Sequence, residues 1–279
     1  MRRSYMKFQF IRFTMTAFAL SLMILTVILH SSSSHAETNA AKEKSAEPAS
    51  EKMIDFEADE LLKAMSATLE SAKSFSFKAH VNFDDVLESG QKIQYGGDIE
   101  ITVKRPNKIV ASFDGDLVEK NLWLDNDTLT ILNKDNNFYG QLAVPSTIDE
   151  TVDFILDNYD FTIPLADLVY SNPYESFSKN IQTGVVVGDG KVEGNDCVHL
   201  AFEQEYIDWQ IWINKSDRHL PCKLVINYKS IEGGPQYNAE FSDWKLNDKI
   251  EDSEFKALIP EEDLKIEFIK MQRVKGDKK

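Results

Sequence analysis

The fold is decided by residues 75–103, which read FSFKAHVNFDDVLESGQKIQYGGDIEITV. Apolar side chains occupy every second position from Phe75 to Phe83, and polar side chains fill the positions between them. The alternation resumes at Ile93 after a turn near Gly90. Because successive side chains of a strand point to opposite faces, this pattern predicts two strands joined in a hairpin, each with one apolar and one polar face.

The sequence on both sides of this hairpin predicts one helix and a series of further strands. Before the hairpin, apolar residues recur every three to five positions between Phe56 and Ala72, which favours an amphipathic helix. The further strands are predicted near 108–114, 117–124, 128–133, 138–144, 181–188, 195–203, 206–213, 220–228 and 236–245. Gaps of turn length between strands are typical of antiparallel meanders rather than of βαβ units.

Residues 147–179 interrupt the strands with helical patterns. Thr147 and Glu150 have the spacing of a capping box at the start of a helix. Pro164 stands where a second short helix can begin, because the first turn of a helix tolerates proline. A turn at Asn172-Pro173 precedes a third helical piece. The order of elements predicts an α+β fold, with one large antiparallel sheet and helices gathered on one face.

The N-terminus has the layout of a secretory signal peptide. Four basic residues precede an uncharged and mostly apolar run, residues 13–29. Ser34 and Ala36 provide small side chains at the −3 and −1 positions of a cleavage site before Glu37. We therefore expect residues 1–36 to be removed and the mature protein to be periplasmic. The alternative is an uncleaved anchor, although the run is slightly shorter than the roughly 20 residues that span a membrane.

The mature chain is expected to be an acidic, single-domain protein. Residues 37–52 lack aromatic and branched aliphatic side chains, so they predict a flexible linker. Residues 53–272 form the predicted domain, and residues 273–279 form a predicted disordered tail. The net charge of −15 becomes −19 when four basic residues leave with the signal peptide. Such a surface repels phosphate backbones, so nucleic acid is not an expected partner, and no stable membrane anchor is expected after cleavage.

No recognised catalytic, metal-binding or cofactor-binding motif is present in the sequence. The mature part has three histidines, His80, His199 and His219, and none has a nucleophile or metal-ligand partner at a suitable spacing. Cys197 shares a strand face with His199, but two residues define neither a nucleophile nor a metal site. We therefore expect a non-enzymatic protein without cofactor or metal. A hydrolase is the least supported alternative.

The two cysteines, Cys197 and Cys222, are expected to be free thiols. Strand alternation places Cys222 on the apolar face with Leu224, and places Cys197 on the opposite face. If their strands are the outer two of a three-stranded meander, roughly 9–10 Å separates them. A disulfide needs Cα atoms within about 7 Å. An oxidising compartment permits the bond, but this geometry argues against it.

Several local motifs occur together in the order found in one protein family. They are Lys104-Arg105-Pro106, Pro164-Leu165-Ala166-Asp167-Leu168, His199-Leu200-Ala201-Phe202, Asp208-Trp209-Gln210-Ile211-Trp212-Ile213, Leu220-Pro221-Cys222-Lys223-Leu224-Val225-Ile226, and Gly234-Pro235-Gln236-Tyr237 followed by Trp244. Over roughly residues 53–270 the chain resembles the predicted periplasmic proteins grouped as domain of unknown function 2092. Cys222 departs from the family pattern, in which a basic residue is expected there.

That family is in turn similar to the lipoprotein carriers LolA and LolB and to the sensor RseB. The resemblance implies a LolA-like fold, a large curved antiparallel sheet (an unclosed half-barrel) with helices covering its concave face. It carries over no catalytic residue. Because no lipidation cysteine lies near the processing site, a soluble carrier of the LolA kind is a closer analogue than membrane-anchored LolB.

We therefore expect a carrier of a lipid, an acyl chain or a lipoprotein anchor, with an apolar cavity beneath residues 147–179. The residues expected to line the cavity are Phe75, Phe77, Tyr95, Ile99, Phe202, Trp209 and Ile211. Periodicity alone predicts the same residues for a filled core. A filled core would favour the alternative, an envelope-stress sensor or interaction module whose partner is an envelope protein.

Overall fold

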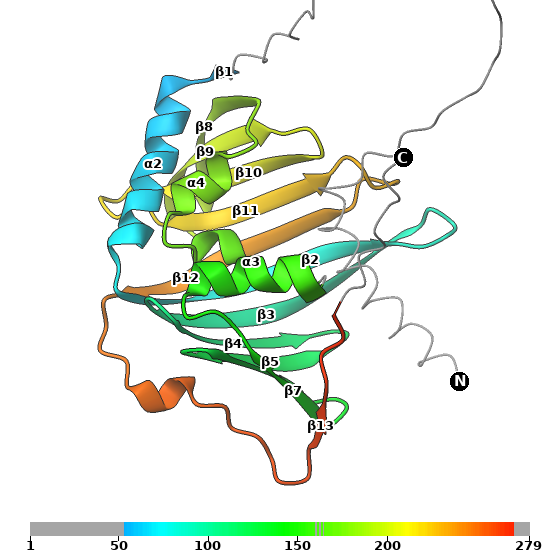
Figure 1. Cartoon of the computed structure of the whole chain (residues 1–279). Coiled ribbons are helices and arrows are strands. Elements are labelled where there is room, and N and C mark those ends of the chain that lie inside the picture. The colour runs from blue at the N-terminus through cyan, green and yellow to red at the C-terminus, as the bar shows by residue number, and fades with distance from the viewer. Residues whose placement is uncertain (1–52, 160, 162, 164, 271–279) are drawn as a thin grey trace, which may run out of the picture.

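One 13-stranded sheet carries helices on one of its faces (Figure 1). The computed structural model describes residues 53–159, 161, 163 and 165–270. The strand order is β1-β8-β9-β10-β11-β12-β2-β3-β4-β5-β6-β7-β13, so β1 and β13 end the sheet without pairing with each other. The α+β fold and the large unclosed sheet, both predicted from the sequence, are confirmed.

Two antiparallel meanders make up most of the sheet. The first comprises β2 (Ser74–Val86), β3 (Lys92–Lys104), β4 (Lys108–Gly115), β5 (Glu119–Asp125), β6 (Thr128–Asn133) and β7 (Phe138–Ala143). The second comprises β8 (Thr183–Val192), β9 (Asn195–Glu203), β10 (Ile207–Asn214), β11 (Pro221–Tyr228) and β12 (Gln236–Leu246). Antiparallel pairing of β12 with β2 joins the two meanders into one sheet. Every strand predicted from alternation is present.

The sheet is mixed rather than purely antiparallel, which corrects the predicted fold. The two-residue strand β1 (Met53–Ile54) pairs in parallel with β8, and the short strand β13 (Leu264–Ile266) pairs in parallel with β7. Such short strands have no alternation to detect, so the sequence did not predict them. The predicted signal peptide, linker and C-terminal tail lie outside the described residues.

The helices form where capping and backbone geometry allow. They are α2 (Phe56–Ser71), α3 (Ile148–Tyr159), the 3₁₀ helix η2 (Ala166–Leu168), α4 (Pro173–Ser178) and the unpredicted 3₁₀ helix η3 (Asp252–Phe255). Thr147 caps α3, because its Oγ1 accepts a hydrogen bond from the Glu150 N–H at 3.2 Å. The second helical piece is shorter than predicted, since Leu165 has a left-handed φ of 61° and cannot join a helix. No helix among the described residues is long and apolar enough to cross a membrane.

The core lies between the helices and one face of the sheet, called here the covered face. Helix α2 contributes Leu62, Met65 and Leu69, which are fully or almost fully buried. Helices α3, η2 and α4 are called here the lid. In Figure 1, α3 lies over the middle of the sheet near β12 and β2, and α4 lies beside α2. The lid residues buried in the same core are Ile148, Val152, Ile155, Leu168 and Phe177. The lid is therefore part of the main core and not an appendage.

The turn between β3 and β4 holds the lid at two points, the start of α3 and the segment between η2 and α4. The Arg105 guanidinium donates hydrogen bonds to the carbonyl oxygens of Val169 and Tyr170, both at 2.8 Å. At the start of α3, the Ile148 N–H donates to the Pro106 carbonyl at 2.8 Å. Burial lowers the pKa of Arg105, and nearby Asp149 opposes that shift. The two Arg105 bonds are partly buried, so they are screened by water less than contacts at the surface would be.

Arg105→Ala should loosen the lid. Loss of two hydrogen bonds to a charged group is expected to cost about 1.5–3 kcal/mol in the free energy of unfolding, measured in urea. Amide hydrogen exchange should accelerate in α3 and α4 more than in β2 and β3. Arg105→Lys is the matched control, because it keeps the charge but loses the planar fork and should recover only part of the loss. Unchanged exchange in the lid would contradict this role of Arg105.

Candidate functional site

A row of large side chains crosses the covered face along the strand register. It contains one residue from each of six neighbouring strands. In order from β9 to β3, these are Phe202, Trp209, Ile226, Tyr237, Phe83 and Tyr95. Side chains opposite one another in antiparallel strands lie close enough to touch, so the row forms a continuous apolar band with two tyrosines and one tryptophan.

Trp209 lies where this row meets the lid. Its ring stacks on that of Phe202, with ring centroids 4.3 Å apart. It also contacts the ring of Phe177 on α4, with ring centroids 5.4 Å apart. Only 3% of Trp209 is exposed. Its indole Nε1 is buried and has no hydrogen-bond partner among the described residues. A buried N–H without a hydrogen-bond partner lowers the stability of the folded state. Trp209 is therefore a candidate ligand-binding residue rather than a purely structural core residue.

Tyr237 is a second buried polar group without a partner on this face. Its hydroxyl has no hydrogen bond within the described part of the chain. Burial raises the pKa of Tyr237, and the neighbouring Tyr228 raises it further. Burial also raises the pKa of Tyr228, with a smaller contribution from the negative charge of Asp167 on the lid.

Asp167 brings a carboxylate from the lid to the same region. The Ser176 hydroxyl donates a hydrogen bond to Asp167 Oδ1 at 2.5 Å. Burial nevertheless raises the pKa of Asp167, because this bond compensates only part of the lost hydration. Asp167, Trp209, Tyr228 and Tyr237 are called here the polar centre. An apolar band with a polar centre can hold a molecule that is mostly hydrocarbon and has a hydrogen-bonding group.

The predicted lining residues are divided among three places on the covered face. Phe202, Trp209 and Ile211 lie together on β9 and β10. Phe75 and Phe77 lie at the start of β2 and pack with Trp244, whose ring centroid is 4.5 Å from that of Phe77. Those five residues and Ile99 on β3 are buried in the main core. Tyr95 is half-buried near the far end of the β2–β3 hairpin, 6.1 Å from Phe83 between ring centroids.

Tyr237 and Asp167 were not among the predicted site residues. Tyr237 alternates with Ala239 and Phe241, so its place on the covered face could have been found from periodicity. Asp167 gave no such signal, because a carboxylate in a short helix is ordinarily solvated. Only the packing of η2 against the sheet reveals its burial.

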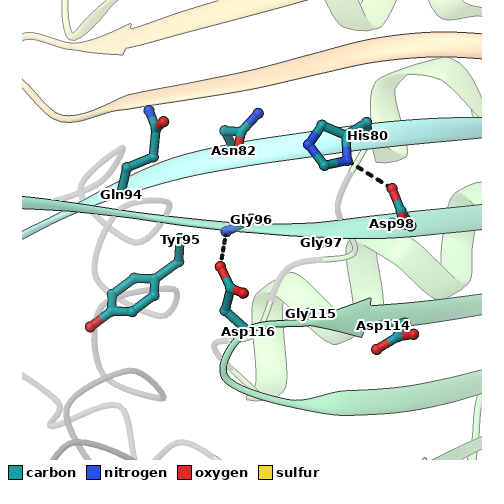
Figure 2. A pocket seen from close by; sticks show the side chains of 10 residues that line it. All are labelled: His80, Asn82, Gln94, Tyr95, Gly96, Gly97, Asp98, Asp114, Gly115 and Asp116. Atoms are coloured by element: carbon teal, nitrogen blue, oxygen red, sulfur yellow. Dashed lines mark hydrogen bonds and ion pairs between the residues drawn. The ribbon is translucent and has the colours of Figure 1, made fainter.

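A shallow pocket of about 520 Å³ lies where β4 ends, beyond which β3 pairs only with β2 in the described residues (Figure 2). His80, Asp98 and Asp114 are cross-strand neighbours there, and His80 Nδ1 lies 2.8 Å from Asp98 Oδ1. The Gly96 N–H donates to Asp116 Oδ2 at 2.7 Å. These charged side chains are exposed and belong to the outer face, opposite the covered face. The pocket therefore does not suit an apolar ligand.

The outer pocket has neither a hydroxyl or thiol nucleophile of Ser, Thr or Cys nor, in the described residues, a metal-binding cluster. Figure 2 shows Tyr95 pointing away from Gln94 and Asn82, so its side chain does not join their polar groups. No cysteine, serine or threonine lines the pocket to serve as a nucleophile. In the described residues, no three side chains of His, Cys, Asp or Glu are arranged to hold a metal ion.

The geometry predicted for the two cysteines was wrong. They are free thiols in this structure, but their sulfur atoms are only 2.8 Å apart, in hydrogen-bond contact. The cause is a bulge in β11, since Trp212 pairs with Lys223 but Ile213 pairs with Pro221. The extra residue, Cys222, leaves the alternation set by Leu224 and lies beside Cys197, Val192 and Trp212.

A family model identifies the chain. The model described as "Predicted periplasmic protein (DUF2092)" matches residues 58–269. The chain belongs to this family. The resemblance stated from the local motifs is thereby confirmed. A comparison with curated proteins finds no match.

Several solved structures are similar to this chain at low identity. One is an uncharacterized conserved protein from Thermus thermophilus, with 8% identity, coverage of 76% of this chain and 99% of that one, and a TM-score of 0.45. LprF from Mycobacterium bovis has 12% identity, coverage of 74% and 97%, and a TM-score of 0.43. A LolA superfamily protein from Nitrosomonas europaea has 11% identity, coverage of 72% and 97%, and a TM-score of 0.36. Identities this low say nothing about a ligand or partner.

Tyr237→Phe should stabilise the ligand-free protein. The substitution removes a buried hydroxyl that has no partner in the described structure, so the free energy of unfolding should rise by about 1 kcal/mol. Tyr206→Phe is the control, because Tyr206 is 41% exposed and its substitution should change stability by less than about 0.5 kcal/mol. Urea unfolding of both variants provides the measurement. A loss of stability in Tyr237→Phe would mean that its hydroxyl is satisfied in solution.

Asp167→Asn should change how stability depends on pH. Burial raises the pKa of Asp167 above its ordinary value of 3.8, so the folded protein keeps this proton when the unfolded chain has lost it. The stabilisation is complete below the ordinary value and is lost as pH rises through the higher folded value. Unfolding measured from pH 3 upward should therefore show a steeper decline in the wild type than in Asp167→Asn. Parallel curves would show that Asp167 is hydrated.

Proposed function

We propose that this protein is a non-enzymatic periplasmic carrier that holds a lipid, an acyl chain or a lipoprotein anchor between the covered face and the lid. In this proposal the signal peptide is cleaved after Ala36. The observation that carries the proposal is the pair of buried, unpartnered polar atoms, Trp209 Nε1 and Tyr237 Oη, within an apolar band. The family's description as periplasmic supports the location.

The apolar and polar parts of the covered face would have different roles in binding. The apolar side chains around Phe202 and Ile211 would contact the hydrocarbon of the ligand. The polar centre would bind its ester, amide or carboxyl group, with Trp209 Nε1 donating a hydrogen bond and Tyr237 Oη donating or accepting one. Because lid residues such as Ile155 and Phe177 pack in the same core as the sheet, the ligand would enter as the lid moves outward.

A second candidate function is supported by that same close packing. The main core runs without interruption from the sheet into the lid. Neither the outer pocket nor a smaller pocket beside Cys222 and Trp244 is lined by residues of the lid. A filled core would suit a module that senses envelope stress by binding another protein. The two candidates differ in whether the covered face opens to accept a hydrophobic molecule.

Ligand binding is tested with chain purified from a bacterial periplasm. Native mass spectrometry and lipid extraction identify what co-purifies, and a fluorescent fatty acid added after delipidation measures uptake. Trp209→Glu should weaken uptake about tenfold or more, because it places a charge in the apolar band. Trp212→Glu is the matched control on the same strand, since Trp212 faces outward and stacks on His199 with ring centroids 3.9 Å apart.

Tyr237→Phe separates binding from folding. It removes only a hydroxyl, so it should weaken uptake about five- to tenfold through the loss of one hydrogen bond while the protein stays folded. If the delipidated wild type takes up no fatty acid and the purified protein carries no lipid, the carrier proposal fails and the interaction module is favoured. Equal weakening by Trp209→Glu and Trp212→Glu would show that uptake does not occur at the covered face.

A further inference from the structure

A buried pair of thiols lies on the outer side of the sheet, away from the polar centre. Cys197 on β9 and Cys222 on β11 are 25 residues apart in sequence, and their sulfur atoms are 2.8 Å apart. Neither side chain has more than 5% of its surface exposed. A sulfur–sulfur bond is about 2.05 Å long, so less than about 1 Å of movement separates contact from bonding.

The strand register and the bulge in β11 bring the two thiols together. β10 separates β9 from β11, and the last residue of β10, Asn214, is the register partner of Cys197. The bulge in β11 then turns Cys222 toward the outer side, where Cys197 already points. Val192 and Trp212 pack around the pair and limit the directions in which the sulfur atoms can move.

One of the two thiols also borders a pocket. The pocket has a volume of about 210 Å³, and its walls include Cys222, Asn214, Arg218 and Trp244 but not Cys197. Cys222 is 5% exposed, whereas Cys197 is completely buried. A reactant from solution would therefore meet Cys222 first.

We propose that Cys197 and Cys222 form an intramolecular disulfide when the chain folds in an oxidising compartment. The oxidant is a disulfide, either that of a dithiol oxidoreductase or a small-molecule disulfide such as oxidised glutathione. This proposal rests on export from the cytoplasm and not on the identity of any ligand.

The reaction is balanced by two thiol–disulfide exchanges. The thiolate of one cysteine attacks the oxidant, whose S–S bond breaks, and a mixed disulfide forms. The second cysteine then attacks the sulfur of the first, which releases the oxidant as a dithiol or as two thiols. Two S–H bonds of the protein are exchanged for one S–S bond. The two protons and two electrons leave with the reduced oxidant.

Burial determines when this reaction can occur. It raises the pKa of the Cys222 thiol to about 12, and the contact with Cys197 contributes further. Because the thiolate is the nucleophile, the folded reduced protein should react slowly at neutral pH. The unfolded or folding chain has no such restriction. We therefore expect oxidation to accompany folding, and the finished bond to resist reductants while the protein stays folded.

The first test compares the thiol content of the same chain from two compartments. One preparation is exported to a bacterial periplasm with its N-terminal segment, and the other is made without that segment in a reducing cytoplasm. Each is unfolded, alkylated with iodoacetamide and weighed by mass spectrometry, with and without prior reduction. The exported chain should take up no label before reduction and two labels after it. The cytoplasmic chain should take up two labels in both cases.

The second test measures the effect of the bond on stability. The oxidised wild type should unfold roughly 5–10 °C above the reduced wild type, because the bond closes a 25-residue separation in the unfolded chain. Cys197→Ala and Cys222→Ala are the controls. Each should show one alkylatable thiol and a melting temperature that does not respond to reductant.

Two outcomes would overturn the proposal. One is two alkylatable thiols in the exported wild type that persist after refolding in a buffer of oxidised and reduced glutathione. The other is oxidation that yields only dimers or glutathione adducts instead of the internal bond. Either result would leave ligand uptake at the covered face unaffected, so this failure is distinguishable from failure of the carrier proposal.

Discussion

The pairing of β12 with β2 is the constraint on which the rest of the molecule depends. It joins residues such as Ala239 and Val81, which are far apart in sequence, and makes two separate meanders into one sheet. Phe241 and Phe77 meet across the same boundary, with ring centroids 5.7 Å apart. Without this pairing neither meander would have a large enough apolar face to hold the lid, because a sheet gains independent stability from burying one face against helices.

Alternation predicted the strands because one face of nearly every strand is buried and the other is wet. It failed where that regularity is broken. The bulge in β11 places Cys222 on the side of the sheet opposite to the predicted one. Alternation near Pro221 did not indicate this extra residue. The strands β1 and β13 were too short to show a period. The helical segment was found from Thr147, whose predicted capping bond is present. It was also found from the predicted turn at Asn172-Pro173, where the structure shows that Asn172 caps α4.

The candidate site was predictable as a face but not as a set of polar groups. Phe202, Trp209 and Ile211 were found because apolar residues at alternate positions must share one side of a strand. The unpartnered atoms of Trp209 and Tyr237 are consequences of packing, which sequence periodicity does not contain. The same holds for Asp167, whose burial follows from the packing of η2 in the folded chain. The sequence therefore predicted the apolar residues of the covered face but not its unpartnered polar groups.

The two ends of the sheet are protected from association with other chains by different means. β13 covers one half of the β7 edge, from Phe138 to Gly140. β1 pairs with Thr183 and Gly184 of β8, and among the described residues no other strand pairs with the rest of that edge. The rest of the edge has a register shift between Val186 and Gly188. It then carries the ion-paired Asp189 and Lys191. A bent, charged edge is a poor template for the addition of a strand from another chain.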